Sequence, residues 1–183
     1  MRRRKGSIMF ARMAAGFVLA MSLAAPVLAH GPARLKTEQS VVLDAPVAEV
    51  WAVVGNFSDP SWDPSTKSFS AAANEKGATR TRVMTSGGEV TEELMKLDPA
   101  KHAISVRFVS DNIEAVKASN YASHITLKDE GGKTRVDWRG AFYRAFPQNE
   151  PPADLNDDAS TEAVRAHHQA GLDALAARFG KVN

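Results

Sequence analysis

One long amphipathic segment near the C-terminus, residues 156–179, constrains the fold more than any other feature of this sequence. Its apolar side recurs at helical spacing and comprises Val164, His168, Gly171, Leu172, Leu175 and Phe179. About 24 residues at a rise of about 1.5 Å predict a helix roughly 36 Å long. A helix of this length with one apolar face needs a broad surface on which to bury it.

The preceding segments supply such a surface, because apolar and polar residues alternate in them as in β-strands and short polar turns separate them. Strands are expected at residues 35–43, 79–85, 89–97, 103–109, 119–128 and 133–146. Short turns between neighbouring strands favour a meandering antiparallel sheet. The sequence therefore predicts an α+β fold in which a curved antiparallel sheet wraps around the long C-terminal helix.

A short helix is expected after the first strand. Asp44 or Ala45 lies at its cap and Pro46 in its first turn. Its buried stripe comprises Val47, Val50, Trp51 and Val54, and Gly55 ends it. Residues 57–66 form a turn-rich stretch.

Residues 1–29 have the pattern of a signal peptide. A basic start precedes an uncharged, mostly apolar run at 13–24, which is too short for a membrane helix of about 20 residues. Small or branched residues then lead to a predicted cut after Ala29. We expect a periplasmic mature domain, residues 30–183, with no stable membrane anchor after cleavage; an uncleaved anchor is the alternative.

Composition excludes several function classes. The chain has 23 basic and 21 acidic side chains, but five of the basic ones lie in the leader, so the mature part carries 18 and 21, a net charge of −3. This balance does not favour nucleic-acid binding. The absence of cysteine excludes thiol chemistry. No spacing typical of a metal site or of a phosphate-binding or dinucleotide-binding loop occurs, so no metal or cofactor is predicted.

Several motifs in order resemble the START-like or Bet v 1-like (SRPBCC) superfamily, which includes polyketide cyclases/dehydrases and lipid-transport proteins. They comprise Ala45-Pro46, Val50-Trp51, Phe57, Trp62-Asp63-Pro64, Thr91 to Leu94, Asp98-Pro99 and Asn120-Tyr121, followed by the long helix. The resemblance covers residues 38–180. It implies a helix-grip fold with a largely apolar cavity between sheet and helix.

A closer resemblance is to the MxaD-type periplasmic proteins of methanol oxidation. It rests on the leader and on residues 30–32, 140–144 and 151–157, and it departs from their Trp-His-Pro motif at Asp63. It implies methanol dehydrogenase or its cytochrome c as a partner. The acidic residues Glu150, Asp154, Asp157 and Asp158 are the predicted docking site for a basic partner, although a solvated loop has the same composition.

Strand alternation and the resemblance together predict a pocket for a small hydrophobic ligand. Its expected lining comprises Trp62, Glu92, Leu94, Phe108, Tyr121, Trp138, Phe142, His168 and Leu172. In plant hormone receptors of the superfamily, the residues resembling Glu92 and Tyr121 face the ligand. The aromatic residues are equally consistent with ordinary core packing, and His167 and His168 with structural roles.

Two hypotheses of function follow. The first is a non-catalytic accessory protein or a small-apolar-ligand or lipid-binding protein, one that assists electron transfer from methanol dehydrogenase to cytochrome c. The alternative is an enzyme similar to polyketide cyclases or dehydratases, in which Glu92, Tyr121 or His168 acts as an acid or base.

Overall fold

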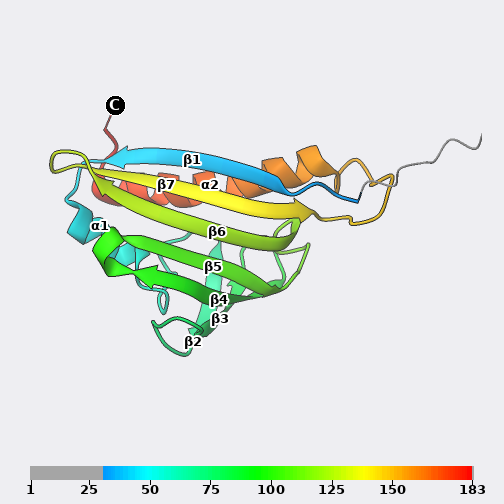
Figure 1. Cartoon of the computed structure of the whole chain (residues 1–183), viewed down its shortest axis with the longest axis horizontal. Coiled ribbons are helices and arrows are strands. Elements are labelled where there is room, and N and C mark those ends of the chain that lie inside the picture. Colours follow the sequence, from blue (N-terminus) through cyan, green and yellow to red (C-terminus); the bar gives the residue numbers. More distant parts are fainter. Residues whose placement is uncertain (1–30, 183) are drawn as a thin grey trace, which may run out of the picture.

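A computed structural model describes residues 31–182 as one seven-stranded antiparallel sheet with two α-helices (Figure 1). The strands are β1 (Leu35–Leu43), β2 (Thr66–Ala71), β3 (Thr79–Met84), β4 (Glu89–Asp98), β5 (Ala103–Ser110), β6 (Ala118–Asp129) and β7 (Thr134–Arg144). The helices are α1 (Val47–Val54) and α2 (Asp157–Phe179), with a 3₁₀ turn, η1 (Pro99–Lys101). The strand order is β1-β7-β6-β5-β4-β3-β2.

The long helix α2 packs against β1, β6 and β7 on one face of the sheet, as Figure 1 shows. Its buried side chains include Val164, His168, Leu172 and Leu175, as the helical spacing predicts. The Asn156 side chain caps its first turn by accepting from the backbone N–H of Ala159. The α+β, helix-grip architecture is therefore confirmed.

Two apolar clusters fill the space between the sheet and the helices. One lies toward α1 and comprises residues such as Leu43, Val50, Leu94, Leu127, Val136, Leu172 and Leu175. The other lies toward the start of α2 and comprises Met84, Val90, Phe108, Ala115, Val116, Ala118, Tyr121, Phe142 and Val164. Between the clusters lie the polar side chains that form the candidate site.

Two local predictions were incomplete. Strand β2 was not predicted, because its sequence is mostly exposed at the edge of the sheet and lacks apolar alternation. Pro46, rather than Asp44 or Ala45, occupies the cap of α1, without a side-chain hydrogen bond to the helix.

The predicted signal peptide lies outside the described residues. In residues 31–182, no helix has the length and apolarity needed to cross a membrane.

Candidate functional site

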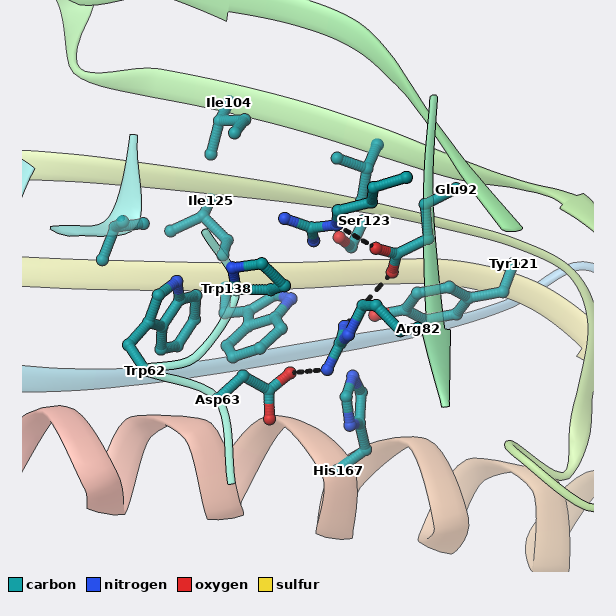
Figure 2. Close-up of a pocket in the computed structure, with 14 residues that line it drawn as sticks. Trp62, Asp63, Arg82, Glu92, Ile104, Tyr121, Ser123, Ile125, Trp138 and His167 are labelled. Carbon is teal, nitrogen blue, oxygen red and sulfur yellow. Dashed lines mark hydrogen bonds and ion pairs between the residues drawn. The ribbon is translucent and has the colours of Figure 1, made fainter. Parts of the chain in front are cut away.

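The β3–β4 hairpin carries charged side chains on the face that the sheet buries. Alternation along β3 places Arg80 and Arg82 on the same side as the buried Met84. The antiparallel register sets Arg80 directly opposite Glu92 of β4. In Figure 2, Glu92 and Asp63 approach the guanidinium of Arg82 from two sides. The hairpin thus positions three charges, and the loop after α1 supplies the fourth, Asp63.

These four side chains form a connected set of buried ion pairs, which we call the charged quartet. Arg82 Nη2 lies 2.5 Å from Asp63 Oδ2, and Arg82 Nη1 lies 3.3 Å from Glu92 Oε1. Arg80 Nε lies 2.5 Å from Glu92 Oε2. Each residue is at most 9% exposed. Two positive and two negative groups balance, which is the condition under which buried charges are tolerated.

Pairing keeps both carboxylates of the quartet ionised. Burial alone would raise the pKa of Glu92, but the charges of Arg80 and Arg82 outweigh it and hold that pKa below its ordinary value. The pKa of Asp63 is also lowered, since His167 and Arg82 together outweigh the effect of burial. Neither carboxyl group therefore carries a proton to donate at neutral pH.

Tyr121 from β6 and His168 from α2 meet in the layer between sheet and helix. The hydroxyl lies 2.7 Å from Nε2 of the imidazole, which stacks on the indole of Trp138 at a centroid distance of 4.6 Å. Burial raises the pKa of Tyr121 and lowers the pKa of His168 to about 3. The two side chains therefore form a neutral, hydrogen-bonded pair at physiological pH.

The neighbouring His167 points from α2 toward the charged quartet (Figure 2). Its Nδ1 lies 3.0 Å from the hydroxyl of Ser65, which itself donates to Asp63 at 2.5 Å. A serine hydroxyl has one hydrogen, so Ser65 accepts from His167, and Nδ1 carries the proton. Burial lowers the pKa of His167. At neutral pH, Nε2 is consequently unprotonated and able to accept a hydrogen bond.

A cavity of about 30 Å³ remains among these groups. Its lining includes the whole charged quartet together with Trp62, Tyr121 and Trp138. Ligand pockets usually measure roughly 300 Å³ or more, whereas this space suits a water molecule or two. The prediction of a largely apolar, ligand-sized cavity was therefore wrong, because indole rings and long charged side chains occupy that volume.

The nine predicted pocket residues fall into two groups. Four of them line the cavity: Trp62, Glu92, Tyr121 and Trp138. The other five are buried in the packing around it: Leu94, Phe108, Phe142, His168 and Leu172. Alternation correctly places those predicted pocket residues that lie on strands on the inner face of the sheet. It does not determine whether such a side chain borders empty space or packs against another side chain.

The sequence patterns did not mark Asp63, Ser65, Arg80 or Arg82 as site residues. A signal for the arginines was available, because the turn at residues 86–88 sets the pairing of the two hairpin strands and so places Arg80 opposite Glu92. No comparable signal existed for Ser65, since its position depends on how the loop after α1 folds back onto α2.

A larger concavity lies on the surface beside the cavity. This groove, of about 400 Å³, runs between α2, the β3–β4 turn and the connection from β5 to β6. Its lining comprises Ser65, Met84, Thr85, Ser86, Glu114, Ala115, Val116, Lys117, Ala163 and His167. His167 also lines the inner cavity, so its imidazole stands at the boundary between the two spaces.

The predicted docking residues lie before and within the first turn of α2. Glu150 and Asp158 are exposed. Asp154 pairs with Lys117 at 3.5 Å, and Asp157 pairs with Arg144 at 3.4 Å. Within residues 31–182, no group of three His, Asp or Glu side chains is arranged to hold a metal ion.

The seven-stranded sheet, the long helix across it and the small polar interior define a helix-grip protein of the START-like class. The chain belongs to the family described as polyketide cyclase / dehydrase and lipid transport, whose model matches residues 34–180. No curated protein matches this sequence.

Solved structures share this fold. The protein XoxI from Bacillus cereus is 22% identical, with a TM-score of 0.65 over 79% of this chain and 94% of its own. An uncharacterised protein from Bacillus thuringiensis is 23% identical, with a TM-score of 0.65 over 79% of this chain and 98% of its own. The Zhui aromatase/cyclase of a Streptomyces species is 20% identical, with a TM-score of 0.64 over 80% of this chain and 93% of its own.

Proposed function

We propose that this protein is a non-catalytic accessory protein of the periplasm that docks onto a basic partner, and that it assists electron transfer from methanol dehydrogenase to cytochrome c. The observation that carries the proposal is a concentration of acidic residues in residues 111–117 and 148–162, which we call the acidic end. It contains seven carboxylates and one lysine: Asp111, Glu114, Glu150, Asp154, Asp157, Asp158, Glu162 and Lys117.

The two segments of the acidic end lie at the same end of the sheet (Figure 1), and the ion pair of Lys117 with Asp154 links them. Five of the seven carboxylates form no ion pair within the described part of the chain. Val109 and Ile113, in and just after β5, are 56% and 43% exposed. Apolar side chains with a charged surround are typical of protein docking surfaces, and the charge selects a basic partner.

The interior supports a non-catalytic role. Glu92 is bound to two arginines, the Tyr121–His168 pair is neutral, and the cavity of about 30 Å³ leaves no room for a substrate beside them. The alternative is a cyclase or dehydratase that uses these groups. The polar residues are close together, as such an enzyme requires, but none is a free acid or base, and the cavity is too small for a substrate. The setting in methanol oxidation rests on the resemblance to MxaD-type proteins.

The test is the rate of electron transfer from methanol dehydrogenase to its cytochrome c, with and without the mature protein, at low and high ionic strength. We expect stimulation at low salt that weakens as salt screens the charges. A Glu150→Lys/Asp158→Lys variant should lose most of this stimulation. The matched control, Glu75→Lys/Glu130→Lys, makes the same charge change at exposed sites outside the acidic end and should retain it.

Absence of stimulation by the native protein at low salt would reject the accessory role. Stimulation that is insensitive to salt and equal in both variants would support the accessory role but would show that the acidic end is not the docking surface. Turnover of a cyclase or dehydratase substrate that depends on Glu92 would replace the proposal with the alternative.

A further inference from the structure

The helix α2 lies across one face of the sheet (Figure 1), and the opposite face, which we call the outer face, is rich in basic side chains. Strand alternation and the register of β1, β7, β6, β5 and β4 place seven of them there: Arg34, Lys36, Lys96, Arg107, Lys128, Arg135 and Arg139. The same register places four acidic side chains there: Glu38, Glu93, Asp98 and Asp137. The outer face thus has a net charge of +3, whereas residues 30–183 together carry −3. The protein therefore presents two surfaces of opposite sign, the outer face and the acidic end.

Ion pairs account for all four carboxylates of the outer face but not for all of its basic groups. Each carboxylate has a basic partner, and Asp137 is shared by Lys128 and Arg135. Arg34 and Lys36 form no ion pair within the described part of the chain. At the acidic end the unpaired groups are carboxylates instead. An unpaired surface charge favours a partner of opposite sign, so the outer face selects an acidic one.

A hollow of about 520 Å³ lies in the middle of the outer face. Ala122 and Ala141 are opposite each other on β6 and β7, and their short side chains leave this space open. Lys36, Arg139 and the half-exposed Met95 also line it. An apolar floor within a charged surround is typical of a protein docking surface, where a protruding side chain of the partner enters the hollow.

The size of the outer face suits a transient protein complex. Five strands about 4.8 Å apart, each about nine residues long at about 3.3 Å per residue, form a surface of roughly 20 Å by 30 Å, or about 600 Å². Burial of about 600 Å² on each partner is at the lower end for specific complexes, where electron-transfer encounters are found. The carboxylates among the basic groups disfavour a uniformly anionic membrane surface or nucleic acid.

The outer face adjoins the acidic end. Strands β5 and β7 end at Ser110 and Arg144, and the two segments of the acidic end, 111–117 and 148–162, follow these strands in the chain. Two proteins bound to the two surfaces would therefore lie beside each other. Electron transfer requires such a placement, since its rate falls steeply with the distance between donor and acceptor.

We propose that the outer face is a second docking surface and that it binds an acidic protein. The inference rests on the proposed accessory role: one member of the dehydrogenase–cytochrome pair binds the acidic end, the other binds the outer face, and this protein holds the two side by side. It extends that role, because the acidic end by itself binds one of the two proteins and leaves the other to find the complex by diffusion.

The test measures the affinity of the mature protein for purified methanol dehydrogenase and for its cytochrome c, each separately, by biolayer interferometry at low salt. The variant Lys36→Glu/Lys96→Glu reverses two exposed charges of the outer face. It should weaken binding of one of the two proteins about tenfold or more and leave the other unchanged. The variant Glu150→Lys/Asp158→Lys should have the converse effect. Retained binding of the second protein shows in each case that the variant is folded.

The matched control is Lys67→Glu/Lys76→Glu. It makes the same change of charge at exposed lysines of β2 and of the loop that follows it, away from both docking surfaces. This variant should bind both proteins with native affinity. Weaker binding in the control and in Lys36→Glu/Lys96→Glu alike would show that net charge, and not the outer face, sets the affinity, which overturns the inference.

The remaining outcomes separate this inference from the accessory role. Stimulation of electron transfer by the native protein, with unchanged binding in Lys36→Glu/Lys96→Glu, would overturn the inference and leave the accessory role intact. Loss of both proteins in one variant would mean that they share one surface, which also overturns it. No stimulation and no binding of either protein would overturn both proposals. Binding to phosphatidylglycerol vesicles but to neither protein, lost in Lys36→Glu/Lys96→Glu, would replace the acidic protein by an anionic membrane.

Discussion

The hydroxyl of Tyr121 and the Nε2 of His168 are 2.7 Å apart although 47 residues separate them in the chain. This contact joins β6 to α2 across the layer in which the charged quartet lies. Nδ1 of the same imidazole is buried without a partner in residues 31–182. Within these residues, the hydrogen bond to Tyr121 is therefore the one hydrogen bond that this buried ring makes, and its loss should be measurable.

Replacing Tyr121 by phenylalanine should lower the free energy of unfolding by about 1–3 kcal/mol, since it leaves a second buried nitrogen of His168 unpaired. Urea unfolding measures the change. A double-mutant cycle with His168→Leu should give a coupling energy of about 0.5–3 kcal/mol. Additive effects of the two substitutions would show that the hydrogen bond contributes nothing of its own.

Replacing Arg82 by methionine should cost about 3–5 kcal/mol of stability, because Asp63 loses its ion-pair partner and Glu92 loses one of two. The control is Arg107→Met on β5. Arg107 pairs with Glu93 at 2.7 Å, but its side chain is 53% exposed, so this change should cost less than about 1 kcal/mol. Equal losses in the two variants, by chemical denaturation, would contradict the buried role of the quartet.

Stability should fall as the solution is made acidic below pH 6.5. The pKa of His168 is lowered from 6.5 to about 3, so between these values the unfolded chain binds a proton that the folded chain does not. The free energy of unfolding should decrease by about 1.4 kcal/mol per pH unit from this residue. The lowered pKa values of Asp63 and Glu92 add a further loss below about pH 4.5.

Urea unfolding at several pH values between 7 and 4 measures that slope. The variant His168→Gln removes the titrating group and should flatten the curve between pH 6.5 and 5, with the part due to His167 remaining. A slope identical to that of the native protein would mean that His168 is accessible to protons in the folded state.

Replacing Gly171 by alanine should destabilise the protein. A Cβ atom there would lie 2.5 Å from Trp138 and 3.4 Å from Trp62. Alanine is favoured over glycine in a helix by about 1 kcal/mol, but overpacking of a core site costs about 1–3 kcal/mol. The control is Ala170→Gly at the adjacent, exposed position of α2, which should lose about 1 kcal/mol.

The signature of the Gly171→Ala variant is a lower unfolding midpoint together with a shifted Trp138 indole N–H signal. A gain in stability would show that helix propensity outweighs the contact with the indole ring.

Local patterns predicted most of the backbone. The strand expected at 35–43 is β1, with the same limits, and the helix expected at 156–179 is α2, Asp157–Phe179. These features depend on neighbouring residues: the alternation of apolar side chains, a capping asparagine and glycine-rich turns that set the register of a hairpin. Strand β2 was not predicted, because its side chains are mostly exposed and show no apolar alternation. Its backbone is held in the sheet by antiparallel pairing with β3.

Local patterns in the sequence predicted six of the seven strands, both helices and the face on which their apolar side chains lie. The tertiary structure alone decided the contents of the interior. Asp63 and Ser65 reach Arg82 and His167 only when the loop after α1 folds against the sheet and α2. An inward-facing residue can border a pocket or fill it. Which of the two occurs depends on the volumes of side chains from distant segments, because protein interiors are close-packed.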